Sequence, residues 1–582
     1  MPRDAITYDN EGVAAVLDEI GDLLELKGEN VFRAVTYRAV ARAIRDLREP
    51  IAALVEQDRL GEIPKVGPSV KDAIVQLVST GTSIRHEELK AAVPSGLITL
   101  LGVPGVGPAT ARIIYDNLRI TTVDELEEAA KAHRLRELPK IQAKTEENIL
   151  KSIASLKQRT GRNLVHHARA AATAMVDWMR QETGIEAIAI AGSLRRYRET
   201  IGDIDLLVAS LAAGPVMDAL IRAPSVERVL AHGETKTSVI VARGLQIDLR
   251  VVPPDSWGAA LLYFTGSKEH NVRLRGYALK KKLLLNEYGL YRVGAEARGQ
   301  EIASRTEEDI YDALGMPWIA PELREDHGEI DAAVANALPS LVTQGEVRGD
   351  LHTHTNWTDG HDTLEAMARR ARAKGYAYWA VTDHSPGLGM TNGLGAERIT
   401  ARVEEARRLN EELAPFRILV GTEVDIRANG SLDYPDDMLA RFDIVSASVH
   451  SAFGQTKEVM TERVLTAMRH PLVTQISHPT GRLLERRDPH ALDLQALIDT
   501  AVKTGTWVEI NGGPERLDLP DVWVRKALDK GVTLVANSDA HAVEEIDWME
   551  FAVATARRGW APGAAIANTA ELGAMLARRK RR

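Results

Sequence analysis

The spacing of apolar residues changes along the chain and divides it into three regions. Up to about residue 90, apolar residues recur every three or four positions, as Val16, Ile20 and Leu23 do, which predicts amphipathic helices. Between residues 188 and 252 they form runs of strand length. After residue 348 such runs alternate with helical patterns, which indicates a parallel α/β barrel. We therefore expect a multidomain protein in which a helical N-terminal region precedes an α+β region and a C-terminal α/β barrel.

Two short segments with glycine separate helices in the N-terminal region. Residues 63–68 have the sequence Ile-Pro-Lys-Val-Gly-Pro, and residues 103–108 have the near copy Val-Pro-Gly-Val-Gly-Pro. Glycine between two short helices permits a tight hairpin and exposes backbone N–H groups at a helix N-terminus, where they bind phosphate. Such a hairpin holds a DNA backbone without reading bases. The pattern resembles the helix-hairpin-helix motif, which implies DNA-backbone contacts from Val66, Gly67, Gly105, Val106 and Gly107.

A third segment, residues 138–144, has lysine and glutamine at the two glycine positions. It predicts a plain helical corner rather than a phosphate clamp. A purely structural αα-corner is also the alternative interpretation of the first two segments.

Two carboxylates begin an apolar run in the middle region. Asp203 and Asp205 open a predicted strand, and alternate residues of a strand lie on one face. Two ionised carboxylates side by side repel each other, and a divalent cation such as Mg²⁺ removes that repulsion. The alternative is a solvated acidic turn.

The residues just before this pair suit a phosphate group. Gly192 and Ser193 follow another apolar run and offer backbone N–H groups and a hydroxyl, while Arg195 and Arg196 can offset negative charge. Together with the two carboxylates, they predict a metal–phosphate site.

A third carboxylate, Asp248, lies on the polar face of an alternating run at residues 245–252. If its strand pairs beside that of Asp205, three carboxylates converge on two cations about 3.5–4 Å apart, the arrangement for in-line phosphoryl transfer. The pattern resembles the nucleotidyltransferase palm of family X DNA polymerases, the family of DNA polymerase beta. The resemblance implies that Asp203, Asp205 and Asp248 hold two Mg²⁺ ions and carry nucleotidyl transfer.

The resemblance continues through residues 263–275. In the family, a Tyr-Phe-Thr-Gly-Ser segment lies against the nucleotide sugar and screens out a 2′-hydroxyl. A later Asn contacts the incoming base, and an Arg four residues further on reaches the template strand. The resemblance implies nucleotide contacts from Gly192, Ser193, Arg196, Gly202, Tyr263, Phe264, Gly266, Ser267, Asn271 and Arg275.

Two positions depart from polymerase beta. Gln246 stands where the family has an arginine that helps orient the primer end and the third carboxylate, so we expect a lower catalytic rate. Ala73 stands where the family has the lysine that forms a Schiff base with an abasic sugar. Lys71 and Lys65 lie close in the sequence but do not match that position, so we expect little lyase activity.

Histidines and carboxylates gather where the apolar runs of the last region end. Six of the nine histidines after residue 345 lie at such ends, with Asp359, Glu423 and Asp539 beside them. In a parallel barrel, catalytic groups lie at the strand C-termini. Imidazole and carboxylate without thiolate suit Zn²⁺, Mn²⁺ or Fe²⁺. A lone buried histidine is usually structural, whereas six at equivalent places predict a metal centre.

This region resembles the polymerase and histidinol phosphatase (PHP) domain, a distorted TIM-like (β/α)7 barrel that binds three metals. Bacterial family X polymerases carry it at the C-terminus, where it acts as a 3′–5′ exonuclease and 3′-phosphoesterase and, in some members, as an abasic-site endonuclease. The resemblance implies three Mn²⁺ or Zn²⁺ ions. All nine family ligand positions are occupied, by His352, His354, Asp359, His384, Glu423, His450, His478, Asp539 and His541.

Composition and charge agree with this interpretation. The 582 residues carry a net charge of −9, but residues 151–300 hold 22 basic and 14 acidic side chains, where a phosphate backbone would need them. Residues 301–550, which contain the second site, hold 25 basic and 43 acidic side chains. The absence of cysteine excludes disulfides and thiolate metal sites. No run has the length of a membrane span and the first residues do not begin a signal peptide, so we expect a cytoplasmic, nucleoid-associated protein.

We expect a monomeric family X DNA polymerase that binds gapped or primed double-stranded DNA and dNTPs and fills short gaps in base excision repair. The alternative is a PHP-type phosphatase with a vestigial polymerase half. The expected divisions are a DNA-binding domain at 1–90, a thumb-like hairpin subdomain at 91–159, the palm at 160–255, nucleotide-selecting fingers at 256–318, a linker at 319–347, the PHP domain at 348–575 and a basic tail at 576–582.

Overall fold

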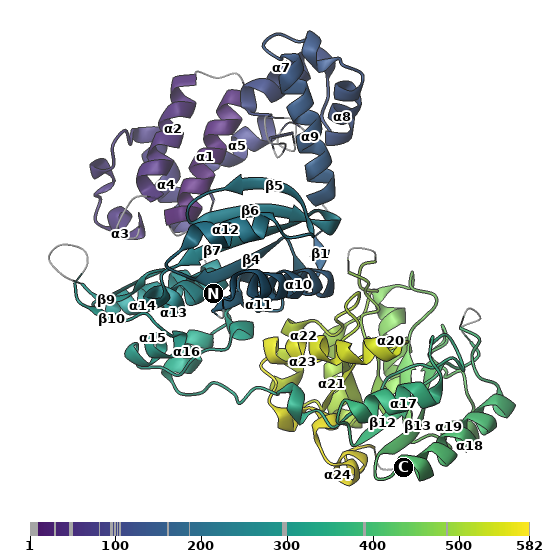
Figure 1. Cartoon of the computed structure of the whole chain (residues 1–582). Coiled ribbons are helices and arrows are strands. Elements are labelled where there is room, and N and C mark those ends of the chain that lie inside the picture. The colour runs from purple at the N-terminus through teal and green to yellow at the C-terminus, as the bar shows by residue number, and fades with distance from the viewer. Residues whose placement is uncertain are drawn as a thin grey trace. The chain divides into compact units, whose positions relative to one another are not determined.

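The structure is a computed structural model that divides into two compact units, Met1–Gly161 and Arg162–Arg582 (Figure 1). No described helix is long and apolar enough to cross a membrane. The residues that the structure describes are 10–27, 31–45, 51–80, 82–93, 97, 100–101, 103, 106–159, 162–185, 187–293, 299–387, 391–484 and 487–580.

The first unit is helical, as its apolar spacing predicts. Val13, Leu17, Ile20 and Leu24 follow one face of the first helix and are buried in a core shared by the whole unit. The helices are α1 (Asn10–Lys27), α2 (Val31–Arg45), α3 (Ile51–Glu56), α4 (Pro68–Thr80), α5 (Ile84–Ala92), α7 (Pro108–Leu118), α8 (Val123–Lys131) and α9 (Ala143–Arg159), with 3₁₀ turns at Leu60–Glu62 and Leu135–Glu137.

Three hairpins with one backbone pattern connect helices of this unit. In each, an N–H donates to the carbonyl three residues earlier: Val66 to Ile63, Val106 to Val103 and Ile141 to Leu138. Residues 138–144 therefore share the backbone turn of the other two hairpins, and their role as a plain corner rather than a phosphate clamp stays a prediction. Lys65 (φ 68°) and Lys140 (φ 65°) adopt the left-handed conformation that the turn needs, at a cost of about 1–2 kcal/mol for a residue other than glycine.

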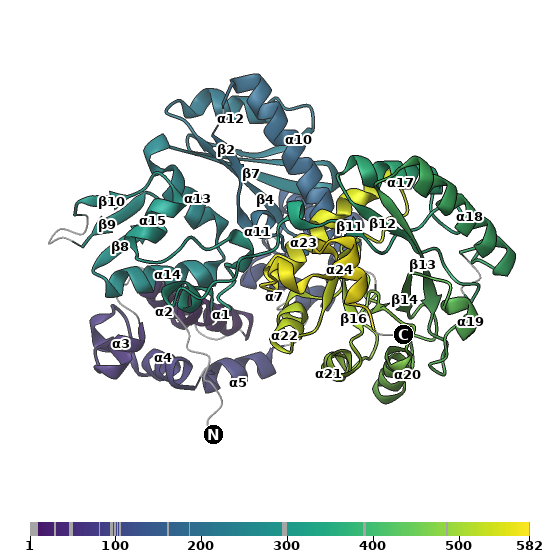
Figure 2. The same cartoon turned by 90° about the horizontal axis from the view of Figure 1, so that it is seen from below.

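The second unit begins with a five-stranded sheet whose order is β2-β4-β7-β6-β5. β4 and β7 are parallel, and the other neighbours are antiparallel. α10 (Val165–Thr183) and α12 (Ala213–Ile221) lie side by side over this sheet (Figure 2). The strands are β2 (Ile188–Ile190), β4 (Asp203–Ala209), β5 (Val226–His232), β6 (Lys236–Val241) and β7 (Leu245–Val252), and a separate ladder joins β1 (Asn163–Leu164) to β3 (Thr200–Ile201).

Helices and a small antiparallel sheet follow the palm. This region has its own core, which contains Leu274, Ile310 and Tyr311. The segment after residue 318 contributes Ile319 and Ile330 to the same core. The predicted linker is thus packed rather than extended. The elements are α13 (Trp257–Thr265), α14 (Lys268–Lys280), β8 (Leu283–Asn286), β9 (Gly289–Arg292), β10 (Glu301–Ala303), α15 (Glu307–Ala313) and α16 (Glu329–Val334).

The last part of the chain is a seven-stranded parallel barrel, as predicted, with strands in sequence order. The first and last strands are joined beyond their ends by a parallel bridge between Thr353 and Ala540, where the N–H of His354 donates to the Ala540 carbonyl at 2.8 Å. The strands are β11 (Gly349–Asp350), β12 (Tyr378–Val381), β13 (Arg417–Asp425), β14 (Ile444–Ser448), β15 (Gln475–Ile476), β16 (Trp507–Asn511) and β17 (Leu534–Asn537).

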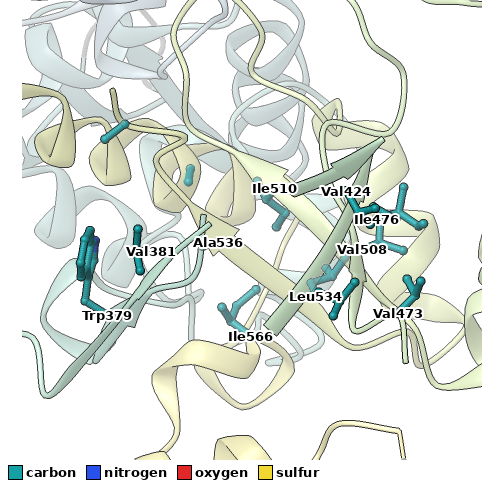
Figure 3. Close-up of a cluster of buried hydrophobic side chains, with 14 of the residues drawn as sticks. Trp379, Val381, Val424, Val473, Ile476, Val508, Ile510, Leu534, Ala536 and Ile566 are labelled. Atoms are coloured by element: carbon teal, nitrogen blue, oxygen red, sulfur yellow. The ribbon is translucent and has the colours of Figure 1, made fainter. Parts of the chain in front are cut away.

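Helices alternate with these strands, and apolar side chains fill the space between the two layers. Figure 3 shows Trp379, Val424, Val508 and Leu534, from four strands, in this buried cluster. The strands are nearly continuous apolar runs because both of their faces are covered. The helices are α17 (Leu364–Ala373), α18 (Ala396–Glu412), α19 (Asp436–Leu439), α20 (Lys457–Arg469), α21 (Leu494–Thr504), α22 (Asp521–Asp529), α23 (Met549–Arg558) and α24 (Leu572–Ala577).

Candidate active sites of the palm and the barrel

The three palm carboxylates lie on two neighbouring strands, with Asp203 and Asp205 at the start of β4 and Asp248 within β7. Asp205 pairs directly with Asp248 across β4 and β7, and Asp203 pairs with Gln246, so the predicted pairing of the two strands is confirmed. Burial, and then repulsion by Asp203 and Asp248, raises the pKa of Asp205 to about 7. Carboxylates held this close resist ionisation until a cation neutralises them, so this donor set fits a hard ion such as Mg²⁺.

Gly192 lies against the side chain of Asp205. Its backbone has φ 62°, and a Cβ at this position would stand 2.2 Å from Asp205 Oδ2. The Ala191 N–H donates to the Asp205 carbonyl at 2.8 Å, which fixes the two segments together. Only glycine meets both requirements. The short helix α11 (Gly192–Arg195), with Ser193 in its first turn, therefore begins beside the carboxylates.

The two arginines of this helix have different partners. The Arg195 guanidinium donates to both carboxylate oxygens of Glu307, at 2.7 and 2.9 Å, and to Thr265 Oγ1 at 2.6 Å. Arg195 thus joins α11 to the segment after the palm, whereas the sequence suggested that it offsets phosphate charge. Arg196 donates to Glu325 at 3.1 Å and to the Thr265 carbonyl.

Two side chains orient Asp248. Gln246 Nε2 donates to Asp248 Oδ1 at 2.8 Å, and Lys236 Nζ, from β6, lies 2.6 Å from Asp248 Oδ2. Burial alone would raise the pKa of Asp248, but the hydrogen bonds from Lys236, Ser238 and Gln246 lower it. The sequence pattern did not point to Lys236. The available signal was a lysine at the start of a run rich in β-branched residues, Lys236 to Val241, shortly before the Asp248 strand.

Several residues of the predicted nucleotide site lie together at the end of α13. Tyr263, Asn271 and Arg275 line one pocket, and Asn271 Nδ2 donates to the Tyr263 carbonyl at 2.7 Å. The Phe264 ring packs edge-on against Tyr263 and lies 4.7 Å from the Arg250 guanidinium. The remaining positions are in loops and caps: Gly202 just before Asp203, Gly266 between α13 and α14, and Ser267 as the N-cap of α14.

The nine predicted ligands of the barrel converge at the C-terminal ends of its strands. Each set brings its ligand atoms within 4.8 Å of one another. Two sets share His352, two share His354 and two share Glu423. The four sets are His354, Asp359, His384 and His541; His352, His354 and Asp539; His352, Glu423 and His478; and His384, Glu423 and His450.

Glu423, at the end of β13, is the centre of the cluster. Its Oε1 lies 2.9 Å from His478 Nε2 and 3.2 Å from His450 Nε2, and its Oε2 lies 3.0 Å from His384 Nδ1. His352 and His354 reach the same oxygen at 3.5 Å. Because one carboxylate touches five imidazoles, the cluster can share cations between neighbouring ligand sets.

The cluster has donor atoms to spare for metal ions. His352 Nε2, both ring nitrogens of His354 and His478 Nδ1 are buried and make no hydrogen bond within the described residues. Burial, followed by the nearby His541 and His384, lowers the pKa of His354 to about 4, so its ring is neutral near pH 7. Neutral imidazole is the form that binds a metal. These residues therefore fit Mn²⁺ or Zn²⁺ better than Mg²⁺.

A second layer of residues, on the strand β16, orients these ligands. The sequence pattern predicted neither the strand nor these residues. Glu509 Oε1 lies 2.7 Å from His352 Nδ1, and Glu509 Oε2 accepts a hydrogen bond from the His478 N–H at 2.6 Å. Asn511 Nδ2 donates to Asp539 Oδ2 at 3.0 Å. Such partners fix the tautomer and orientation of metal-bound histidines. The alternation of Glu509 and Asn511 with apolar residues was the available signal.

The hairpins of the first unit are open where the prediction places phosphate. A Cβ at Gly67 or Gly107 would meet nothing within 4 Å, and each glycine precedes a helix whose first N–H groups lack intrahelical partners. Val66 and Val106 make the turn hydrogen bonds, whereas Gly105 lies outside the described residues.

The lysine that a lyase would need is absent from the matching helix position. Ala73 is 2% exposed in the core of the unit, where a side chain cannot reach a DNA end. Lys71, on the same helix, lies 2.6 Å from Asp58.

Comparison with known proteins decides the family. The chain is 36% identical over 562 residues to the "DNA polymerase/3'-5' exonuclease PolX" of Bacillus subtilis, and the match covers 96% of this chain and 97% of the relative. The chain belongs to the family X DNA polymerases that carry a PHP domain. It is therefore a nucleotidyltransferase with a metal-dependent exonuclease domain.

Family descriptions match separate parts of the chain. A helix-hairpin-helix domain matches residues 8–83, a SAM-like helix-hairpin-helix tandem residues 97–155, the DNA polymerase beta thumb residues 260–325, and the PHP domain residues 350–511. The tandem includes the third hairpin, in agreement with its backbone. The thumb match overlaps residues 256–318, which the sequence analysis expected to be fingers. The hairpin and thumb descriptions support DNA binding by this family X chain.

Two further relatives each match part of the chain. A "Probable phosphatase" of Acetivibrio thermocellus is 31% identical over 34% of this chain and 80% of the relative. The "DNA polymerase lambda" of Arabidopsis thaliana is 25% identical over 54% of this chain and 62% of the relative. The family X assignment accounts for both similarities.

Proposed function

We propose that this family X polymerase fills short gaps in primed double-stranded DNA during base excision repair. It uses dNTPs as substrates and acts as a monomer. The observation that carries this proposal is the direct pairing of Asp205 with Asp248, with Gly192 against the same carboxylate. Intact geometry of this kind supports a working palm rather than a vestigial one. Since its substrate is DNA, we place it in the cytoplasm, associated with the nucleoid.

The palm carboxylates have distinct places in this proposal. Asp203 and Asp205 hold two Mg²⁺ ions, and Asp248 joins them beside the primer 3′-hydroxyl. Bound divalent cations lower the pKa of an attacking hydroxyl and neutralise the triphosphate. Asp248 is held at both oxygens by Gln246 and Lys236, so it keeps one orientation and an ionised carboxyl. Lys236 supplies the positive charge that Gln246 lacks, which offsets the departure from the family arginine.

The nucleotide-binding residues surround these carboxylates. Ser193 and the N–H groups of α11 face the triphosphate together with Arg196, as at other helix N-termini that bind phosphate. Tyr263 and Phe264 screen the sugar, and Phe264 is held in place by Arg250. Asn271 and Arg275 reach the base and the template strand. Gly202, Gly266 and Ser267 shape the backbone around the nucleotide.

The barrel carries the second proposed activity, trimming of DNA 3′ ends by phosphodiester and 3′-phosphate hydrolysis. The nine ligands hold three Mn²⁺ or Zn²⁺ ions, which when bound polarise the phosphate and activate water. Glu509 and Asn511 keep His352, His478 and Asp539 oriented for this. The ligand sets share residues, so their ions act as one centre.

The hairpins contact the DNA backbone in this proposal. N–H groups at Gly67, Gly105 and Gly107 bind phosphates on either side of the gap, without sequence preference, while Val66 and Val106 hold the turns through their own hydrogen bonds. The excess of basic residues in 151–300 adds to the attraction of the palm for DNA.

One experiment tests the proposal against its rival, a phosphatase with a vestigial polymerase half. Purified protein is given a one-nucleotide-gapped duplex with dNTPs and Mg²⁺, and in parallel a 3′-recessed duplex and a small phosphate monoester with Mn²⁺. We expect gap filling and 3′ trimming. Hydrolysis of the small monoester without any dNTP incorporation would favour the phosphatase instead.

A further inference from the structure

The last helix turn of α23, in the barrel, contacts the palm through a buried arginine. Only 3% of the Arg558 side chain is exposed. Its Nη1 donates to the carbonyl of Arg196 at 2.7 Å and to Glu325 Oε1 at 3.0 Å, and its Nη2 lies 2.7 Å from Asp521 Oδ2. A residue of the barrel thus contacts the backbone of a residue proposed to bind the nucleotide.

Glu325 connects the two arginines. The same oxygen, Oε1, accepts from Arg196 Nε at 3.1 Å and from Arg558 Nη1 at 3.0 Å, and both Glu325 and Arg196 are 12% exposed. Burial works to raise the pKa of Glu325, but Arg196 and Arg558 outweigh it and lower the pKa, so the carboxylate is ionised. One buried negative charge is thus shared between two buried arginines, and the more exposed Arg198 lies 3.9 Å from the same oxygen.

Arg196 itself lies between the two segments of the proposed nucleotide site. Its backbone follows α11, and its Nη1 donates to the Thr265 carbonyl at the end of α13. The Nη1 atom lies 3.1 Å from the place that a Cβ on Gly266 would take. A rotation of Arg196 would therefore move its charge and break its bond to the Thr265 carbonyl, next to the turn at Gly266.

The shared carboxylate has an electrostatic consequence. Without the charge of Arg558, Glu325 would keep Arg196 at 3.1 Å and the more exposed Arg198 at 3.9 Å, so it would hold the positive charge of Arg196 more tightly. With Arg558 present, the charge of Glu325 is largely offset, and that of Arg196 remains available to a triphosphate. The bond from Arg558 to the Arg196 carbonyl also fixes the end of α11.

We propose that Arg558, a residue of the PHP barrel, is a positioning residue of the polymerase site, which orients Arg196 toward the triphosphate through Glu325 and through the Arg196 backbone. The proposal rests on the proposed nucleotide-binding role of Arg196. It makes the barrel part of the machinery for synthesis, independently of hydrolysis at its own metal site.

The neighbouring arginine is a matched control. Arg557 lies on the same helix and also joins it to the preceding region, through Glu322 Oε1 at 2.7 Å and the Val342 carbonyl at 3.0 Å. These contacts involve neither Arg196 nor Glu325. If the substitutions only loosened α23, Arg557→Gln and Arg558→Gln should have the same effect on synthesis. If Arg558 positions Arg196, only Arg558→Gln should affect it.

The experiment measures kcat and KM for dNTP on a one-nucleotide-gapped duplex, with 3′ trimming in Mn²⁺ and thermal unfolding recorded for the same full-length proteins. We expect Arg558→Gln to raise the dNTP KM about fivefold to tenfold, since a charge-assisted contact is lost. We expect kcat and 3′ trimming to change less than about twofold, because Arg558 touches neither the palm carboxylates nor the barrel ligands. Arg557→Gln should leave the dNTP KM as in the wild type.

A double-mutant cycle separates positioning from simple structural support. Because Arg558 acts through Arg196, the effects of Arg196→Gln and Arg558→Gln on KM should fail to add. Additive effects, or a wild-type KM in a folded Arg558→Gln protein, would overturn the proposal. If Arg558→Gln does not fold, Arg558→Lys takes its place. A wild-type dNTP KM in Arg558→Lys supports a role for the positive charge, whereas a raised KM that adds to the effect of Arg196→Gln overturns the proposal. A normal KM in Arg196→Gln would instead remove the nucleotide-binding role on which the proposal rests.

Discussion

The palm and the barrel both collect acidic side chains at strand ends, but they balance the charge differently. In the palm, Asp203, Asp205 and Asp248 lie together on β4 and β7, and Lys236 pairs with Asp248 Oδ2. In the barrel, Glu423 alone is surrounded by five histidines within 3.5 Å. The palm therefore needs added cations to ionise fully, whereas the barrel offers imidazole ligands beside its carboxylates. The two sites should differ in metal preference and respond independently to substitution.

The largest expected effect comes from removal of a palm carboxylate. Asp205→Ala deletes a ligand that both proposed Mg²⁺ ions share, so gap filling should fall by at least about a thousandfold, on the scale of a lost transition-state contribution of several kcal/mol. Extension of a gapped primer measures it. Trimming of a 3′ end in Mn²⁺ should continue in the same protein, and near-normal dNTP incorporation would remove the palm assignment.

The matching change in the barrel is the double substitution His352→Ala and His354→Ala. It strips ligands from three of the four sets, so 3′ trimming should fall below detection while gap filling in Mg²⁺ survives. Degradation of a labelled 3′ end, with added Mn²⁺, measures the loss. His470→Ala is the control, because that histidine pairs with Asp436 outside the cluster.

The outcome can also contradict the separation of the sites. Persistent trimming in the double variant would place the nuclease elsewhere. Loss of both activities, with normal unfolding, would mean that the palm depends on the barrel metal centre.

A smaller effect should come from the lysine that compensates for Gln246. Lys236→Met removes the charge on Asp248 Oδ2, so kcat for gap filling should fall about tenfold, as for one charge-assisted hydrogen bond, with the dNTP KM unchanged. Single-nucleotide incorporation measures both constants. Arg228→Met, an exposed residue on the neighbouring strand β5, is the control. A wild-type kcat in Lys236→Met would show that Gln246 orients Asp248 by itself.

The smallest expected effect is on stability in metal-free protein. The pKa of Asp205 in the folded protein is raised to about 7, whereas an aspartate in the unfolded chain has a pKa near 4. Protonated Asp205 therefore adds its full stabilisation of the fold below the unfolded pKa, and this stabilisation is lost as the pH rises through 7. Asp205→Asn cannot ionise and should therefore gain stability relative to the wild type between pH 5 and pH 8, by about a few °C in Tm. Thermal unfolding in EDTA measures the difference, and Mg²⁺ should reduce it. A difference that does not change with pH would mean that Asp205 ionises freely.

Local patterns determined much of this protein. A strand of period two places Asp203 and Asp205 on one face, and a Gly-Val-Gly hairpin leaves N–H groups free at a helix end, because both depend on residues only a few positions apart. The histidines at successive strand ends predicted the barrel and its ligands for the same reason. Lysine can take the left-handed turn position in place of glycine, as Lys65 and Lys140 do, because a cost of about 1–2 kcal/mol is small beside the packing of the unit.

Only the tertiary structure decided which distant groups meet. Lys236 reaches Asp248 because β6 and β7 are neighbours, and Glu509 reaches His352 because β16 and β11 belong to one barrel. Arg195 has Glu307 as its partner, 112 positions away. Arg558 lies 362 positions from Arg196. No spacing in the sequence encodes such contacts, because burial of a charge requires a partner from whichever segment the packed core brings beside it.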